Sequence, residues 1–270
     1  MRVNKRTYPI LDKLQKNSLG VLPFDPVDSG FCLNQKYLDN FVNTWKENAH
    51  IFSKEINVIT NPFMESVEKA SSKLAILAKE AIKGKFKYSG TYVTKDVVFM
   101  VDIDTKETDY GFPGSFYVFH KSGIPLVYRR SSFTNDPSEN IIWASNLAMN
   151  KMIGADVETV VLHYLSFPIV FELFKKHANV EIKHMQPNTK ISTVKCRYKN
   201  ETNLKLTFLD SKWFTTLIKS DSFKVSGHFR LQPKKKDGEF TKELIWINDF
   251  EKTGYTAKAK ILTQSSESIH

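Results

Sequence analysis

The chain is poor in cysteine, with only Cys32 and Cys196 among its 270 residues. Two cysteines this far apart exclude a disulfide framework and a zinc site built from four cysteines, and they favour a reducing compartment. Several catalytic motifs are also missing: there is no glycine-rich phosphate loop, no GxSxG and no HExxH. We therefore expect no nucleotide-dependent, α/β-hydrolase or zincin chemistry, no metal site and no cofactor.

Long hydrophobic runs are missing as well. Residues 1–15, MRVNKRTYPILDKLQ, are charged throughout, so we expect no secretory signal. The most apolar window, residues 157–174, contains Glu158, His163, Pro168 and Glu172 and is short for a bilayer span. We interpret it as a buried helix that Pro168 ends or kinks, and we expect a cytoplasmic protein with no membrane partner.

The chain does have an excess of positive charge, with a net charge of +10 and a pI of about 9.3. Residues 181–270 hold 15 Lys and 2 Arg against 4 Asp and 6 Glu, so this last third supplies +7 of the total. An excess of this kind favours an acidic partner, such as RNA or an acidic protein face. DNA ranks last, because the sequence has no helix-turn-helix or zinc-finger signature.

The hydrophobic periodicity predicts an α+β fold. Apolar residues at helical spacing indicate helices from residue 34, over 61–83, over 139–150 and over 156–176, whereas residues 1–33 look like an irregular lead-in. Three extended runs, 97–103, 115–119 and 124–130, predict a central antiparallel β-meander. Further strands are expected at 194–198, 203–208, 223–231 and 243–247, with a helical turn over 210–219.

These elements divide the sequence into four regions. We expect a helical N-terminal region over 1–90, a β-meander with helices over 91–180, a basic β-rich C-terminal region over 181–263, and a disordered tail over 264–270. No linker rich in glycine, serine or proline marks whether the N-terminal helices form a separate domain.

The most informative stretch is residues 223–247, FKVSGHFRLQPKKKDGEFTKELIWI, which predicts a β-hairpin. The two-residue period of a strand places His228, Arg230 and Gln232 on one face. Residues 233–238, PKKKDG, are expected to form the connecting loop, and residues 244–247 supply an apolar return strand.

This polar face has residue types suited to metal-independent RNA cleavage. His228 has the pKa for proton transfer, Arg230 offers a bidentate fork to phosphate oxygens, and Gln232 could donate a supporting hydrogen bond. With one histidine nearby, a second proton-transfer role has no candidate. A solvated surface hairpin is the simpler interpretation, and plain phosphate binding lies between the two.

The lysines of the hairpin are candidates for holding the RNA backbone. They are Lys234, Lys235, Lys236 and Lys242.

Other polar residues give weaker signals. Asp102 and Asp104 lie on one face of a predicted strand and could bind Mg²⁺, but a polar strand end is favoured. His163 lies in an apolar helical stretch, where a core histidine is more common than a metal ligand, and His177, His184 and His228 lack metal-ligand spacing.

Three segments, taken in order, resemble a widespread family of phage- and plasmid-borne proteins. They are 98–104 (VFMVDID) followed by 114–119 (GSFYVF), the apolar helix around 161–165 (VLHYL), and the hairpin Gly227-His228-Phe229-Arg230 with Trp246. The resemblance spans roughly residues 90–250, and the Gly-His-aromatic hairpin is its most specific part. One branch of this family is an anti-CRISPR aimed at the type V-A nuclease.

The resemblance implies a counter-defence function. The anti-CRISPR branch recognises its target while the target is being made and lowers the corresponding message. Gly227, His228 and Phe229 match the family motif, with Trp246 as the partner aromatic residue. Ser226 stands where the family often has Arg, and Phe229 where it usually has Trp, so a different target is expected.

We therefore expect an anti-CRISPR-like factor that recognises a nascent protein segment of a bacterial host and lowers the linked mRNA. If it is an enzyme, it is a metal-independent ribonuclease. The alternative is a binding module without chemistry that sequesters a host protein.

Overall fold

The computed structural model describes residues 1–16, 35–65, 67–68, 87–104, 114–131, 141–177, 180–192, 197–211, 223–225, 228–236, 239–247 and 250–252. Gly227, both cysteines and the tail over 264–270 lie outside these ranges. The expectations for those residues therefore stay predictions.

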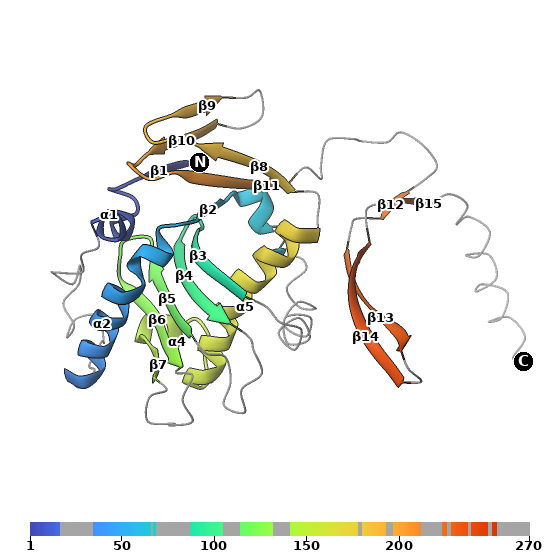
Figure 1. Ribbon diagram of the computed structural model, residues 1–270, viewed down its shortest axis with the longest axis horizontal. Helices are drawn as coiled ribbons and strands as arrows, with labels where there is room; N and C mark the ends of the chain where they lie inside the picture. Colours follow the sequence, from blue (N-terminus) through green and yellow to red (C-terminus); the bar gives the residue numbers. More distant parts are fainter. Residues whose placement is uncertain are drawn as a thin grey trace, which may run out of the picture.

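An eight-stranded mixed sheet forms the centre of the fold (Figure 1). In spatial order its strands are β7 (Ile141–Ala144), β6 (Pro125–Ser131), β5 (Gly114–His120), β4 (Val97–Asp104), β3 (Lys87–Val93), β2 (Ile56–Ile59), β11 (Leu206–Ser211) and β8 (Val180–Met185). β2 pairs in parallel with both β3 and β11, and the other neighbours are antiparallel. The helices and this mixed sheet confirm the α+β class, and β4, β5 and β6 confirm the predicted meander.

Helix α2 (Gln35–Phe52) covers one face of this sheet, as its helical periodicity predicts. Phe41, Trp45 and Phe52 are fully buried and recur at steps of four and seven residues, which places them on one side of the helix. The Phe41 ring stands edge-on to Tyr117 at 5.0 Å and to Tyr128 at 5.1 Å. The Tyr117 hydroxyl also donates a hydrogen bond of 3.0 Å to the carbonyl of Phe41, so ring packing and a hydrogen bond fix α2 to the meander.

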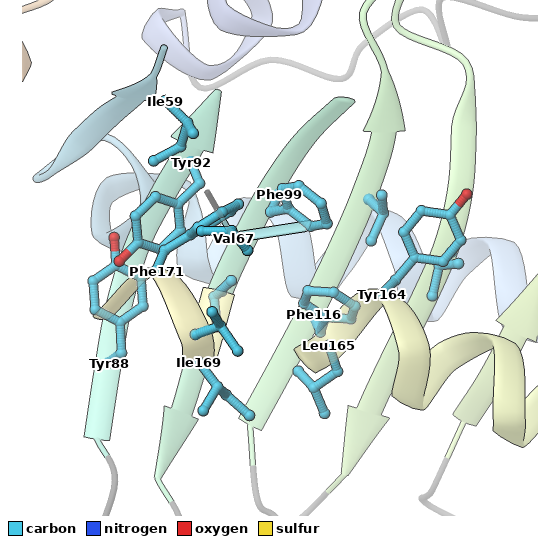
Figure 2. Packing of buried hydrophobic residues seen from close by; sticks show 14 of the residues in the cluster. Ile59, Val67, Tyr88, Tyr92, Phe99, Phe116, Tyr164, Leu165, Ile169 and Phe171 are labelled. Atoms are coloured by element: carbon cyan, nitrogen blue, oxygen red, sulfur yellow. The ribbon is translucent and has the colours of Figure 1, made fainter. Parts of the chain in front are cut away.

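Helix α5 (Val157–His177) covers the opposite face. Its buried Phe171 contacts Tyr92 and Phe99, with ring centroids 5.1 Å and 6.2 Å away (Figure 2). Asp156 caps the helix, because its Oδ1 accepts a 2.7 Å hydrogen bond from the amide of Thr159. The helix continues past Pro168, so the alternative that this proline ends it is wrong.

By length and composition, α5 is also long and apolar enough to cross a membrane. Half of the apolar window is buried within the fold. Core helices of soluble folds pass the same test, and the contacts of Phe171 with the sheet are of that kind.

The predicted helix over 139–150 is wrong for its first half. Residues Ile141–Ala144 form β7, which pairs antiparallel with β6. Only the four-residue helix α4 (Asn146–Met149) follows, and Ser145 caps it by accepting a 3.2 Å hydrogen bond from the amide of Ala148. The open edge of β6 offers a full ladder of backbone hydrogen bonds, and this non-local pairing outweighs the local helical pattern.

Of the lead-in that was expected to be irregular, residues 1–16 are described, and they contain regular structure. β1 (Arg2–Asn4) pairs in parallel with β10 (Arg197–Glu201), which also pairs antiparallel with β9 (Lys190–Ser192). Helix α1 (Pro9–Gln15) follows, and its apolar side chains join the core beneath α2.

Strands from distant parts of the chain therefore share the same sheets. The large sheet takes β2 and β3 from 1–90 or its boundary, β4 to β7 from 91–180, and β8 and β11 from 181–263 or its boundary. The four sequence regions consequently do not correspond to separate sheets. The predicted strands at 194–198 and 203–208 lie a few residues further along, as β10 and β11, and β11 runs through Ser211 where a helical turn was expected to begin.

Replacing Phe41 with alanine should lower the free energy of unfolding by about 3–5 kcal/mol, because the lost ring leaves a cavity between α2 and the sheet. Urea unfolding followed by circular dichroism measures this loss. Ile153→Ala is the control, since Ile153 is 96% exposed, and its effect should stay within about 0.5 kcal/mol. Equal effects of the two substitutions would contradict this packing.

Candidate functional site

The basic hairpin predicted near the C-terminus is present. β13 (His228–Lys236) pairs antiparallel with β14 (Glu239–Ile247), from His228 opposite Ile247 to Lys236 opposite Glu239. The predicted strand over 223–231 is divided, because Phe223–Val225 forms β12 and pairs instead with β15 (Phe250–Lys252).

The predicted loop over 233–238 is wrong, because Pro233 and the three lysines continue strand β13. Only Asp237 and Gly238 separate the last paired residues, Lys236 and Glu239. Asp-Gly is a strong signal for a two-residue hairpin connection, and this signal outweighs the run of charged residues. Pro233 is compatible with the strand because both strands of a two-stranded ribbon are edges.

The register keeps His228, Arg230 and Gln232 at alternating positions of β13, opposite Ile247, Ile245 and Glu243. These three positions therefore share one face of the ribbon, as the sequence predicts. The side chain of Gln232 is exposed.

The four lysines proposed for RNA binding do not share one face. By the same period, Lys234 and Lys236 lie at positions on the face of His228 and Arg230, whereas Lys235 and Lys242 lie on the other. Lys236 is also paired with Glu239 in the ladder. The sequence prediction placed Lys234, Lys235 and Lys236 in one connecting loop, whereas the strand puts their positions on two faces.

Trp246 joins the hairpin to the body of the protein. Its ring centroid lies 5.6 Å from that of Phe174, near the C-terminal end of α5, at an interplanar angle of 62°. Trp246 is partly buried and packs against the core cluster on the α5 side of the sheet. Trp246 is one of the residues that carry the family resemblance, and its ring links the hairpin to α5.

The two aspartates on β4 contact neighbouring strand residues. Asp102 Oδ1 accepts a 2.6 Å hydrogen bond from the hydroxyl of Ser89, and Asp104 forms a 3.1 Å ion pair with Lys87. Across the described ranges, no three His, Cys, Asp or Glu side chains come together in a group that could hold a metal ion.

His163 is not the core histidine that its apolar surroundings suggested. Its side chain is exposed on α5, and its ring stands edge-on to Phe167 at 5.3 Å and to Tyr164 at 5.6 Å. Partial burial against these rings lowers the pKa of His163. His184, also exposed, lies with Nδ1 3.1 Å from the hydroxyl of Thr207.

A polar network beneath the end of α5 was not predicted. The Tyr92 hydroxyl donates a hydrogen bond to Glu172, and Lys175 forms ion pairs with both Glu172 and Glu55. Burial raises the pKa of Tyr92 well above its ordinary value. For Lys175, burial alone would lower the pKa, but the bonds and charges of Glu55 and Glu172 outweigh it and raise the pKa. The spacing of Glu172 and Lys175, one helical turn apart, was the available sequence signal.

Trp246→Ala should loosen the attachment of the hairpin, because a two-stranded ribbon without a packed face is marginally stable in water. Amide hydrogen exchange should become faster throughout β13 and β14 and stay unchanged in β4 and β5. Gln232→Ala, an exposed position on the same ribbon, is the matched control and should leave exchange unchanged. Unaltered exchange in the Trp246 variant would show that the Phe174 contact does not hold the hairpin.

Comparisons of the chain with protein-family models, curated proteins and solved structures give no match. The resemblance of the Gly227–Arg230 motif to the phage- and plasmid-borne family therefore stays a prediction. The candidate interface is defined by the residues of the hairpin itself and by its contact with α5.

Proposed function

We propose that this chain is a counter-defence factor of a mobile genetic element that binds RNA through the β13–β14 hairpin. By this proposal it acts in a bacterial cytoplasm, recognises a nascent host protein segment and lowers the linked mRNA. The observation that carries the RNA-binding step is the series of cations on one nine-residue strand, Arg230, Lys234, Lys235 and Lys236.

A strand suits this task better than a loop would. Alternate residues of a strand lie about 6.6 Å apart. The positions of Arg230, Lys234 and Lys236 share the face of His228, with Gln232 between the first two. A paired backbone loses less conformational freedom when its cations engage phosphates, which favours binding. The charge attraction would depend strongly on salt.

Chemistry on the bound RNA would use the same face. His228 would act as the proton-transfer group of the cleavage reaction, and Arg230 would bind the phosphate oxygens. The exposed Gln232 would donate a supporting hydrogen bond. This metal-independent ribonuclease activity is the enzymatic form of the proposal, and RNA binding without cleavage is its weaker form.

A second candidate function is a binding module that sequesters a host protein. One observation favours it: large apolar side chains are exposed on or beside α4 and the start of α5. They are Ile142, Leu147, Ile153, Val157 and Leu162. Exposed apolar groups gathered in one part of a surface are a feature of protein-binding sites.

Changing Lys234, Lys235 and Lys236 together to alanine should weaken binding to a labelled single-stranded RNA. The affinity for single-stranded RNA falls as salt rises. Each lost phosphate contact should reduce the magnitude of the slope of log affinity against log salt concentration by about 0.7, so the triple variant should reduce it by about 2. Fluorescence anisotropy at several salt concentrations measures the slope.

The matched control removes three exposed lysines from the helices and the turn after α2, namely Lys46, Lys54 and Lys176. It carries the same change in net charge and should keep the slope of the parent chain. Equal losses in both variants would indicate general charge attraction, and an unchanged slope in the hairpin variant would remove the lysines from the interface. Either result overturns the RNA-binding role of the hairpin.

A further inference from the structure

Two adjoining cavities open where the parallel strands of the sheet end. β11, β2 and β3 run in the same direction, so Asp210, Thr60 and Thr94 lie at or just beyond the same edge. The cavities measure about 420 and 460 Å³, and Asn61 and Lys95 line both. The carboxyl ends of parallel strands are a common place for ligands, and each volume suits a small molecule.

The first cavity has an aromatic wall. Phe99, Tyr164 and Phe167 line it together with His163. The rings of Phe99 and Phe167 lie 5.9 Å apart, and His163 stands edge-on to Phe167. Phe99 and Tyr164 are buried, so Phe167 and His163 supply the ring surface that faces the cavity. Aromatic rings stack against planar heterocycles without regard to the details of their edges.

Polar groups border the same wall. Asn61, Thr94 and Glu65 line the first cavity beside the rings. Together an amide, a hydroxyl and a carboxylate supply both donors and acceptors, which is what the edge of a nucleobase requires.

The second cavity is basic. Its cations are Arg2, Lys95 and Lys121, set beside the hydroxyls of Thr7 and Tyr8. Arg2 forms an ion pair with Glu201, and Lys121 forms one with Asp96 at 2.8 Å.

Lys95 differs from these two cations. In the part of the chain that the structure describes, it is exposed and has no ion-pair partner. It is also the cation shared by both cavities. A phosphate held at Lys95 would therefore lie between the aromatic wall and the basic cavity.

One carboxylate in the second cavity has its oxygens held in place. Asp210 is buried, and Oδ1 accepts a 2.7 Å hydrogen bond from Thr60, while Oδ2 accepts one from Tyr198. These two bonds fix the position of Asp210 at the wall of the second cavity.

We propose that these adjoining cavities bind one nucleoside monophosphate unit. The base stacks on Phe167 beside His163, and Lys95 holds the phosphate. A peptide side chain would use the aromatic wall without engaging Lys95, whereas the phosphate of a nucleotide would engage the cation that both cavities share. Because the sequence has no glycine-rich loop, side chains would hold the phosphate. The site is separate from the hairpin and does not depend on the proposed RNA binding there.

The ligand could be a free nucleotide or a nucleotide within RNA, and two probes distinguish these sources. Isothermal titration of the full chain would use AMP, GMP, CMP and UMP in one arm and a short 5′-phosphorylated oligoribonucleotide in the other. Lys95→Ala should weaken binding about tenfold, as expected for loss of a charge-assisted hydrogen bond. Phe167→Ala should weaken it at least about fivefold through lost stacking.

The control is Lys46→Ala, an exposed lysine on α2 that should leave both titrations unchanged. Binding of a monophosphate that both site variants weaken assigns a free nucleotide, whereas binding of the oligoribonucleotide alone, weakened in the same way, assigns an RNA nucleotide. The triple-lysine hairpin variant should retain monophosphate binding, which separates this site from the hairpin.

The proposal is overturned if neither probe binds at millimolar concentration, or if binding is unchanged in Lys95→Ala. Lys95 is exposed, so this variant should fold, and its thermal unfolding should match that of the parent chain. Preferential binding of an aromatic dipeptide, unchanged by Lys95→Ala, would assign a peptide in place of a nucleotide.

Discussion

The fold depends on the burial of both faces of its central strands. Along β4, Val98 and Met100 belong to the core beneath α2, whereas Phe99, Val101 and Ile103 belong to the core beneath α5. A sheet that is apolar on both faces must be covered on both. Helices α2 and α5 meet this requirement, and their positions then determine where the surrounding segments can pack.

α5 connects this core to both proposed functional surfaces. Its Phe171 is buried against the sheet, its Phe174 contacts Trp246 of the hairpin, and its His163 and Phe167 line the first cavity. Insertion of β11 beside β2 supplies the other part of that region, because it brings Asp210 next to Thr60. Residues from both ends of the chain therefore meet where β2, β3 and β11 end.

The sequence predicted the elements that depend on local patterns. Runs of apolar residues identified β4 to β6, helical spacing identified α2 and α5, and alternation identified the β13–β14 hairpin. It did not identify β2, β3 or β8. β2 and β8 pair with strands that lie far away in the sequence, so local patterns do not reveal them. For the same reason, Ile141–Ala144 looked helical although β6 pairs with it.

The candidate site shows the same division. Alternation sufficed to place His228, Arg230 and Gln232 on one face. The Asp237-Gly238 dipeptide, which favours a two-residue hairpin connection, was the signal that could have placed Lys234, Lys235 and Lys236 in the strand. The cavities could not be predicted, because Arg2, Lys95 and Asp210 come together only through the parallel pairing of β1 with β10 and of β11 with β2.

The proposed function requires that the chain act on a specific message through the His228 face of the hairpin. The most direct measurement is RNA sequencing with parallel proteomics in a bacterial host that expresses either the parent chain or the His228→Ala/Arg230→Ala variant. The account predicts loss of one or a few messages and their proteins with the parent chain only. Unchanged messages, together with a host protein that co-purifies with both chains, would contradict it and indicate a sequestering binder.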